Sequence, residues 1–234
     1  ENLTQAAMLV VLLTIPLLAA VLPPVTFLGI HPATVILVVV YVAGVRLAMR
    51  DRTAPMWEPR ETSETREDAP EDDSFRGPST AALWARFVAY LFLIGCAGWL
   101  VARTGAVISA ETGISGSVVG ALMTATVTSF PELVTTIAAV RRGALQLAVG
   151  GIIGGNTFDV LFLSASDVAY REGSIYNDIA PASELWTIVG ILMTAMLLVG
   201  LIRPERYGPA NIGFESVALV GIYLAAAVGA VAMN

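Results

Sequence analysis

No charged residue occurs between Glu1 and Arg46, and most of the side chains in this stretch are apolar. A helix needs about 20 apolar residues to cross the hydrocarbon core of a bilayer, so the stretch is long enough for two crossings. Over all 234 residues, 56% are hydrophobic and 14% are charged, a composition too apolar for a water-soluble domain of this size. The sequence therefore predicts an all-α polytopic membrane protein.

Further apolar segments predict five more membrane-spanning helices. They lie at residues 80–102, 113–140, 145–169, 185–202 and 216–233. The expected order is two helices, a polar linker at residues 49–80 and then five helices, which makes seven. The linker holds nine acids against five arginines and contains four prolines, a composition typical of a solvated tether.

The distribution of arginine predicts the orientation. The chain has no lysine, and with alternating crossings only Arg103 and Arg171 of the thirteen basic residues fall on the side opposite the linker. Because basic residues concentrate on the cytoplasmic side of membrane proteins, we expect the 49–80 linker in the cytoplasm and the C-terminus outside. The expected location is the cell (inner) membrane. The partners expected are the lipid bilayer and small cations, and no nucleic acid.

Two acids stand inside apolar segments. Glu132 follows twenty residues, 112–131, without a charge, and Asp159 lies about as deep in the next segment. A carboxylate in hydrocarbon costs a few kcal/mol, so it needs a cation, a proton or a polar network as a partner. The stretch from Glu132 to Arg141 spans roughly 15 Å of helix, which is half of a core about 30 Å thick. We therefore expect the two acids to meet near the midplane and to bracket one ion.

Both segments contain residues that interrupt helices. Pro131 removes one backbone hydrogen bond and crowds the carbonyl of Val127. The glycine pairs at 150–151 and 154–155 weaken the next helix. Interrupted helices at membrane depth are tolerated only where they are buried in protein or line a polar cavity. We therefore expect broken helices at a substrate site.

The groups around the two acids are oxygen donors, which hard cations such as Ca²⁺ and Na⁺ prefer. The candidate ligands are Glu132, Asp159, Thr128, Ser129, Asn156 and the backbone carbonyl of Ala125. For Asn156, a role in capping or cross-linking helices is an alternative. No cofactor is expected apart from the transported ions Ca²⁺ and Na⁺. No nucleophile is arranged beside the single histidine, so an enzyme is not expected.

Three other polar residues have simpler interpretations. Asp167 lies near the outer end of its segment, where a solvated interfacial acid is expected. His31, at the turn between the first two helices, is expected to be a loop or interfacial histidine, with a metal ligand or a proton relay as the alternative. Cys96 is expected to be a small packed hydrophobe.

Residues 128–136, 141–143 and 147–159 resemble the second α-repeat of the sodium/calcium exchanger branch of the cation/calcium exchanger superfamily. The resemblance implies ten helices in two inverted five-helix repeats, each of which gives one acidic motif to a central site. Carried over by position, Glu132 and Asp159 would be acidic ligands, Thr128 and Ser129 hydroxyl ligands, and Ala125 a carbonyl ligand.

The same resemblance implies how the chain is divided. Residues 1–48 would be the last two helices of the first repeat, 49–80 the acidic cytoplasmic linker, and 81–234 the complete second repeat. Nothing before residue 112 matches the first α-repeat. We therefore expect the chain to be a C-terminal fragment, or to need a partner that supplies the missing half of the site.

The chain departs from the family pattern at three positions. Val127 stands where the family has glycine, Gly155 where it usually has serine, and Gly151 where it commonly has asparagine. Without the serine hydroxyl, the second motif has one oxygen ligand fewer, which affects the expected number of sodium ions and sodium coupling itself. A proton is the alternative coupling ion, because a carboxylate in a low-dielectric environment holds its proton more tightly.

The leading hypothesis is a membrane antiporter that exchanges Ca²⁺ for Na⁺ by alternating access at a midplane carboxylate site. One alternative is a Ca²⁺/H⁺ or other cation/proton antiporter. An alternative from another class is a non-transporting membrane scaffold or subunit, whose polar residues only join helices.

Overall fold

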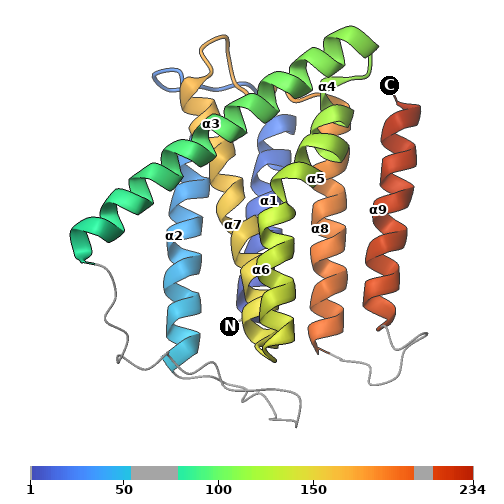
Figure 1. Ribbon diagram of the computed structural model, residues 1–234. Helices are drawn as coiled ribbons and strands as arrows, with labels where there is room; N and C mark the ends of the chain where they lie inside the picture. The colour runs from blue at the N-terminus through green and yellow to red at the C-terminus, as the bar shows by residue number, and fades with distance from the viewer. Residues whose placement is uncertain (1, 54–78, 203–212, 234) are drawn as a thin grey trace.

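The computed structural model describes residues 2–53, 79–202 and 213–233, and these ranges are helical apart from short turns and one isolated bridge between Phe27 and Ile30 (Figure 1). Within them, six helices are long and apolar enough to cross a membrane, and one bent pair of helices makes a seventh. The all-α polytopic fold is therefore confirmed. Most of the predicted linker, residues 54–78, lies outside the described residues.

The long helices are α1 (Asn2–Val21), α2 (Pro32–Thr53), α3 (Thr80–Thr112), α7 (Leu145–Ala169), α8 (Pro181–Ile202) and α9 (Phe214–Ala232). Between α3 and α7 the chain forms one composite span. It consists of α4 (Gly116–Val118), a π-helical turn η1 (Val119–Thr124), α5 (Ala125–Thr128) and α6 (Phe130–Arg141).

The longest helix, α3, continues ten residues beyond the predicted end at residue 102. Arg103 does not stop it, because arginine is a good helix former. The helix ends instead at Gly113, whose left-handed φ of 75° closes the last turn. With 33 residues, α3 is about 50 Å long, which exceeds the thickness of a hydrocarbon core and requires a tilt. It runs obliquely across the other helices, and none of its residues is buried (Figure 1).

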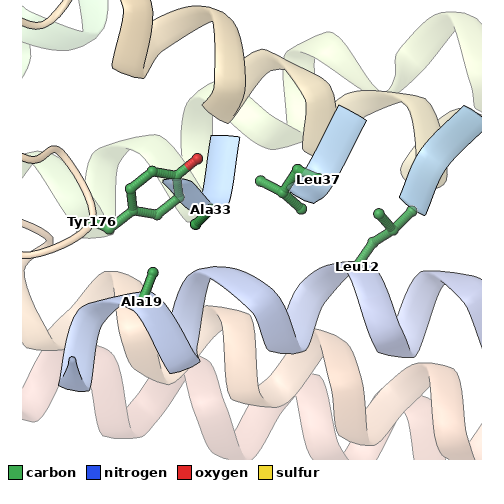
Figure 2. Close-up of a cluster of buried hydrophobic side chains, with 5 residues drawn as sticks. All are labelled: Leu12, Ala19, Ala33, Leu37 and Tyr176. Carbon is green, nitrogen blue, oxygen red and sulfur yellow. The ribbon is translucent and has the colours of Figure 1, made fainter. Parts of the chain in front are cut away.

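The core lies where α1 packs against α2, α7 and α8. Leu12 and Ala19 of α1 face Ala33 and Leu37 of α2, and Tyr176 from the loop after α7 closes the cluster (Figure 2). Lipid tails are as apolar as these side chains, so close packing rather than the hydrophobic effect holds helices together inside a membrane. The small side chains of the two alanines permit that close packing.

One end of the bundle carries both the turn at residues 22–31 and the loop at residues 170–180, and we call it the loop end (Figure 1). The last carbonyls of a helix have no partner within the helix. At the loop end, the side-chain amide of Asn177 donates to the carbonyls of Ala20 and Leu22, over 3.2 and 2.9 Å. Asn177 therefore caps the C-terminus of α1.

The packing of α2 gives a matched test of the core. We expect Leu37→Ala to lower the thermal unfolding temperature of the detergent-solubilised protein, and Leu47→Ala to leave it nearly unchanged. Leu37 is fully buried and Leu47 is 46% exposed, so only the first substitution leaves a cavity. Buried leucine-to-alanine changes cost about 2–5 kcal/mol. Unfolding followed by circular dichroism measures both variants, and equal losses would contradict this assignment of the core.

Candidate functional site

The composite span bends by 44° where α5 meets α6. Pro131 stands in the first turn of α6, where its missing N–H costs nothing, and Ser129 lies between the two helices. The N–H of Ser129 donates to the carbonyl of Ala125, and the N–H of Leu133 donates to the carbonyl of Ser129, both over 3.0 Å. The break that Pro131 predicts in this span is therefore confirmed.

A second irregularity precedes the break and was not predicted. In η1 the backbone hydrogen bonds skip one residue more than in an α-helix, as in the bond from the Ala125 N–H to the Gly120 carbonyl. The turn contacts α3, where a Cβ atom built on Gly105 would lie 3.1 Å from Thr124 Oγ1. π-Helical turns occur frequently at functional sites, and no proline or glycine pair marks this one.

The glycine pairs of α7 do not interrupt it, contrary to the expectation from the sequence. The helix runs without a break from Leu145 to Ala169. Glycine lowers helix propensity by about 1 kcal/mol but keeps its N–H, and packing against α1, α2 and α6 compensates for that cost. A Cβ atom on Gly150 would lie 2.9 Å from Asn2 Oδ1, whereas one on Gly151 or Gly155 would meet nothing within 4 Å. Gly150 thus allows α1 to approach closely, and Gly151 and Gly155 lie on an open face.

The structure places the two acids on neighbouring helices. Glu132 in the first turn of α6 and Asp159 in α7 come from helices that pack side by side (Figure 1). Thr128 and Ser129 precede Glu132 by one turn, and Asn156 precedes Asp159 by three residues. All six predicted site residues, including Ala125, are exposed within this chain.

The hydroxyl of Thr128 bonds its own helix in this structure. Its Oγ1 donates to the carbonyls of Thr124 and Ala125 over 3.1 and 3.2 Å. The oxygen keeps its lone pairs, which a cation can use. The Ala125 carbonyl also accepts the N–H of Ser129, so coordination of an ion by this carbonyl requires the release of one hydrogen bond.

The donors at this face are carboxylate, hydroxyl, amide and carbonyl oxygens, which suit a hard cation. Among the described residues, no group of three or more His, Cys, Asp or Glu side chains lies close enough together to hold a metal ion. A cation at Glu132 and Asp159 would therefore also need hydroxyl and amide oxygens as ligands.

Asp167 is not the solvated interfacial acid that its position predicts, because it is fully buried. Its Oδ2 accepts hydrogen bonds from the backbone N–H of His31, at 2.9 Å, and from Thr34 Oγ1, at 2.6 Å. Thr34 Oγ1 in turn lies 2.7 Å from Tyr176 Oη. His31 is also buried, and its ring lies 5.0 Å from the ring of Tyr176. We call His31, Thr34, Asp167 and Tyr176 the loop-end network.

Comparison with known proteins gives two matches. A family model described as sodium/calcium exchanger protein matches residues 81–232. The inner membrane protein YrbG of Escherichia coli (strain K12) is 34% identical over 111 residues, which cover 47% of this chain and 34% of the relative. The match therefore spans about a third of the length of that relative. No solved structure matches the chain significantly.

The loop-end network predicts a loss of stability in alkaline solution. Burial raises the pKa of Tyr176 above its usual value of 10.0, because the phenolate is poorly solvated there. The folded protein thus holds this proton more tightly than the unfolded chain. The stabilisation is fully present below about pH 10 and is lost as the pH rises towards the folded-state pKa.

We therefore expect the unfolding temperature of Tyr176→Phe to fall less than that of the wild type between about pH 9 and about pH 11. Tyr90→Phe is the control, because Tyr90 is exposed on α3 and lies outside the network. Thermal unfolding at several pH values measures how steeply the unfolding temperature of each variant falls with pH. An unchanged slope in Tyr176→Phe contradicts the prediction.

Proposed function

The chain belongs to the sodium/calcium exchanger protein family, and from this membership we propose that it forms part of an antiporter that exchanges Ca²⁺ for Na⁺ at Glu132 and Asp159. Members of this family are membrane transporters, not enzymes. The observation that carries the proposal is the placement of these two acids, on packed neighbouring helices and on one open face of the protein.

The proximity of the two acids explains why they bind cations. Two carboxylates at close range repel each other, and the repulsion grows as the dielectric constant falls. One Ca²⁺ neutralises both charges, and so do two monovalent cations. Ca²⁺ and Na⁺ therefore compete for the same pair of groups.

The same electrostatics favours exchange over simple release. An unoccupied pair of ionised carboxylates inside a membrane costs more than an occupied pair, because nothing replaces the lost solvation. A site that changes the side from which it is accessible does so more readily when a cation is bound. Alternating access around the Glu132–Asp159 pair then couples the exit of one ion to the entry of another.

The open face supports the second part of the proposal, which concerns the missing repeat. Carboxylates at membrane depth face protein or a water-filled cavity rather than lipid. Here Glu132 and Asp159 are exposed, and α3 buries none of its residues. We propose that a first repeat, from the same full-length chain or from a partner, covers this face and supplies the remaining ligands.

The proposed division of the chain follows from that arrangement. Residues 1–48 belong to the end of the first repeat, 49–80 form the cytoplasmic linker, and 81–234 form the second, inverted repeat. The distribution of arginine supports a cytoplasmic linker and an outer C-terminus. The loop end then faces outward. The proposed location is the inner membrane, as for the relative YrbG.

The first test removes one charge at a time. In the full-length protein, we expect Glu132→Gln and Asp159→Asn to weaken Ca²⁺ binding about ten- to a hundredfold, since a charged contact contributes about 1.5–3 kcal/mol. The unfolding temperature without Ca²⁺ should stay the same or rise, because the repulsion between the two acids is relieved. Calcium-dependent thermal shifts measure the binding.

Glu111→Gln is the matched control, because Glu111 is an exposed glutamate at the end of α3, outside the site. The control should bind Ca²⁺ as the wild type does. If Glu132→Gln binds Ca²⁺ normally and only the assembly of the protein changes, the alternative of a non-transporting scaffold is correct instead.

The second test concerns the coupling ion and the missing repeat. In vesicles that contain the full-length protein, we expect an outward sodium gradient to drive Ca²⁺ uptake more strongly than a pH gradient. Residues 1–234 alone should give no gradient-driven uptake. Equal uptake without sodium would establish proton coupling, and uptake by residues 1–234 alone would remove the requirement for a first repeat.

A further inference from the structure

We propose that Asp167 is a positioning residue that fixes the outer end of α7 on α2, and thereby holds Asp159 opposite Glu132. The proposal rests first on the geometry of the loop-end network, which links the site helix to a helix far away in the sequence. Its consequence for transport also rests on the proposed function of the Glu132–Asp159 pair.

Asp167 caps α2 from another helix. The first N–H groups of a helix have no partner within it, and His31 immediately precedes Pro32, the first residue of α2. The carboxylate of Asp167 accepts the N–H of His31 and the hydroxyl of Thr34, one turn into α2. A negative charge at this place is also favoured by the dipole of α2.

The imidazole of His31 supports the same cap without competing for Asp167. Its Nδ1 accepts the backbone N–H of Ala33 over 3.1 Å, which assigns the ring proton to Nε2 and makes the ring neutral. His31 therefore supplies no positive charge to Asp167. The carboxylate is held by hydrogen bonds and by the end of α2, not by an ion pair with this histidine.

Only one of the two carboxylate oxygens of Asp167 takes part in the cap. Oδ2 accepts both hydrogen bonds, whereas Oδ1 is buried and has no hydrogen-bond partner. Ser164, one helical turn earlier on the same face of α7, is also buried. An asparagine at position 167 can therefore keep the cap with its carbonyl oxygen and place a donor where Oδ1 now lies.

Helix α7 is attached at both sides of the site. Towards the other end of the helix, Asn2 Nδ2 donates to the Gln146 carbonyl over 3.3 Å. Four glycines lie between Gln146 and Asp159. Because glycine makes a helix easier to twist, the hydrogen bond at Gln146 restricts the rotation of α7 at Asp159 only weakly. Asp167 is eight residues, or about 12 Å, beyond Asp159, with no glycine between them.

The attachment itself is tested by a distance measurement in the full-length protein. Spin labels at Val35 of α2 and Val168 of α7, both exposed, report the spacing of the two helices at the loop end in a Cys96→Ala background. We expect Asp167→Ala to broaden or shift the distance distribution. We expect Asp167→Asn to leave it as in the wild type, because the acceptor is retained.

Asn177→Ala is the control for general loosening of the loop end, because the side chain of Asn177 bonds α1 and not α2. Its label distance should stay unchanged even where its unfolding temperature falls. An unchanged distribution in Asp167→Ala, or an equal change in Asn177→Ala, overturns the attachment.

The effect on the site is tested by transport kinetics in the same variants. We expect Asp167→Ala to raise the KM for Ca²⁺ by about tenfold or more, and Asp167→Asn to raise it by less than about threefold. Asn177→Ala should leave KM unchanged. Equal losses in Asp167→Ala and Asp167→Asn overturn the positioning role, because they show that the charge itself is required. If wild-type protein transports no Ca²⁺, the proposed function fails, while the label distances still decide the attachment.

Discussion

A carboxylate in an apolar segment needs a partner that replaces its lost hydration. The acids of α6 and α7 differ in whether such a partner lies within the chain. Asp167 is buried, and the start of α2 donates hydrogen bonds to it. Glu132 and Asp159 are instead exposed on two helices that pack against each other. The first arrangement is complete within the chain and serves the structure. The second is the arrangement expected of a site that an ion enters and leaves.

Much of the fold follows from local properties of the sequence. The length of the apolar segments predicts the spans, and Pro131 predicts the bend because proline cannot donate a backbone hydrogen bond. The glycine pairs predict a break that does not form, because glycine weakens a helix without removing its hydrogen bonds, and packing against three helices outweighs that weakness. The end of α3 at Gly113 also has a local signal, since glycine is the usual residue after a helix.

The candidate site and the loop-end network differ in how far the sequence reveals them. Glu132 and Asp159 lie in adjacent spans joined by a short turn, so their placement on neighbouring helices follows from that turn. Asp167 meets His31 across 136 residues of sequence. No pattern within α7 distinguishes an acid solvated at the membrane interface from one that caps a distant helix. That difference is decided by how α1 and α2 pack against α7, which only the three-dimensional structure provides.

The π-helical turn η1 has a consequence for how the first motif is phased. Each hydrogen bond in such a turn spans one residue more than in an α-helix, which amounts to one inserted residue within the span. One residue corresponds to about 100° of rotation. The wide turn absorbs this rotation, because each of its residues turns the helix by less than in an α-helix, so Ala125 and Thr128 keep their direction relative to the part of the span that contacts α3. A homologue that lacks one residue between positions 119 and 124 would therefore close this turn into regular α-helix and still present Ala125 and Thr128 in the same direction.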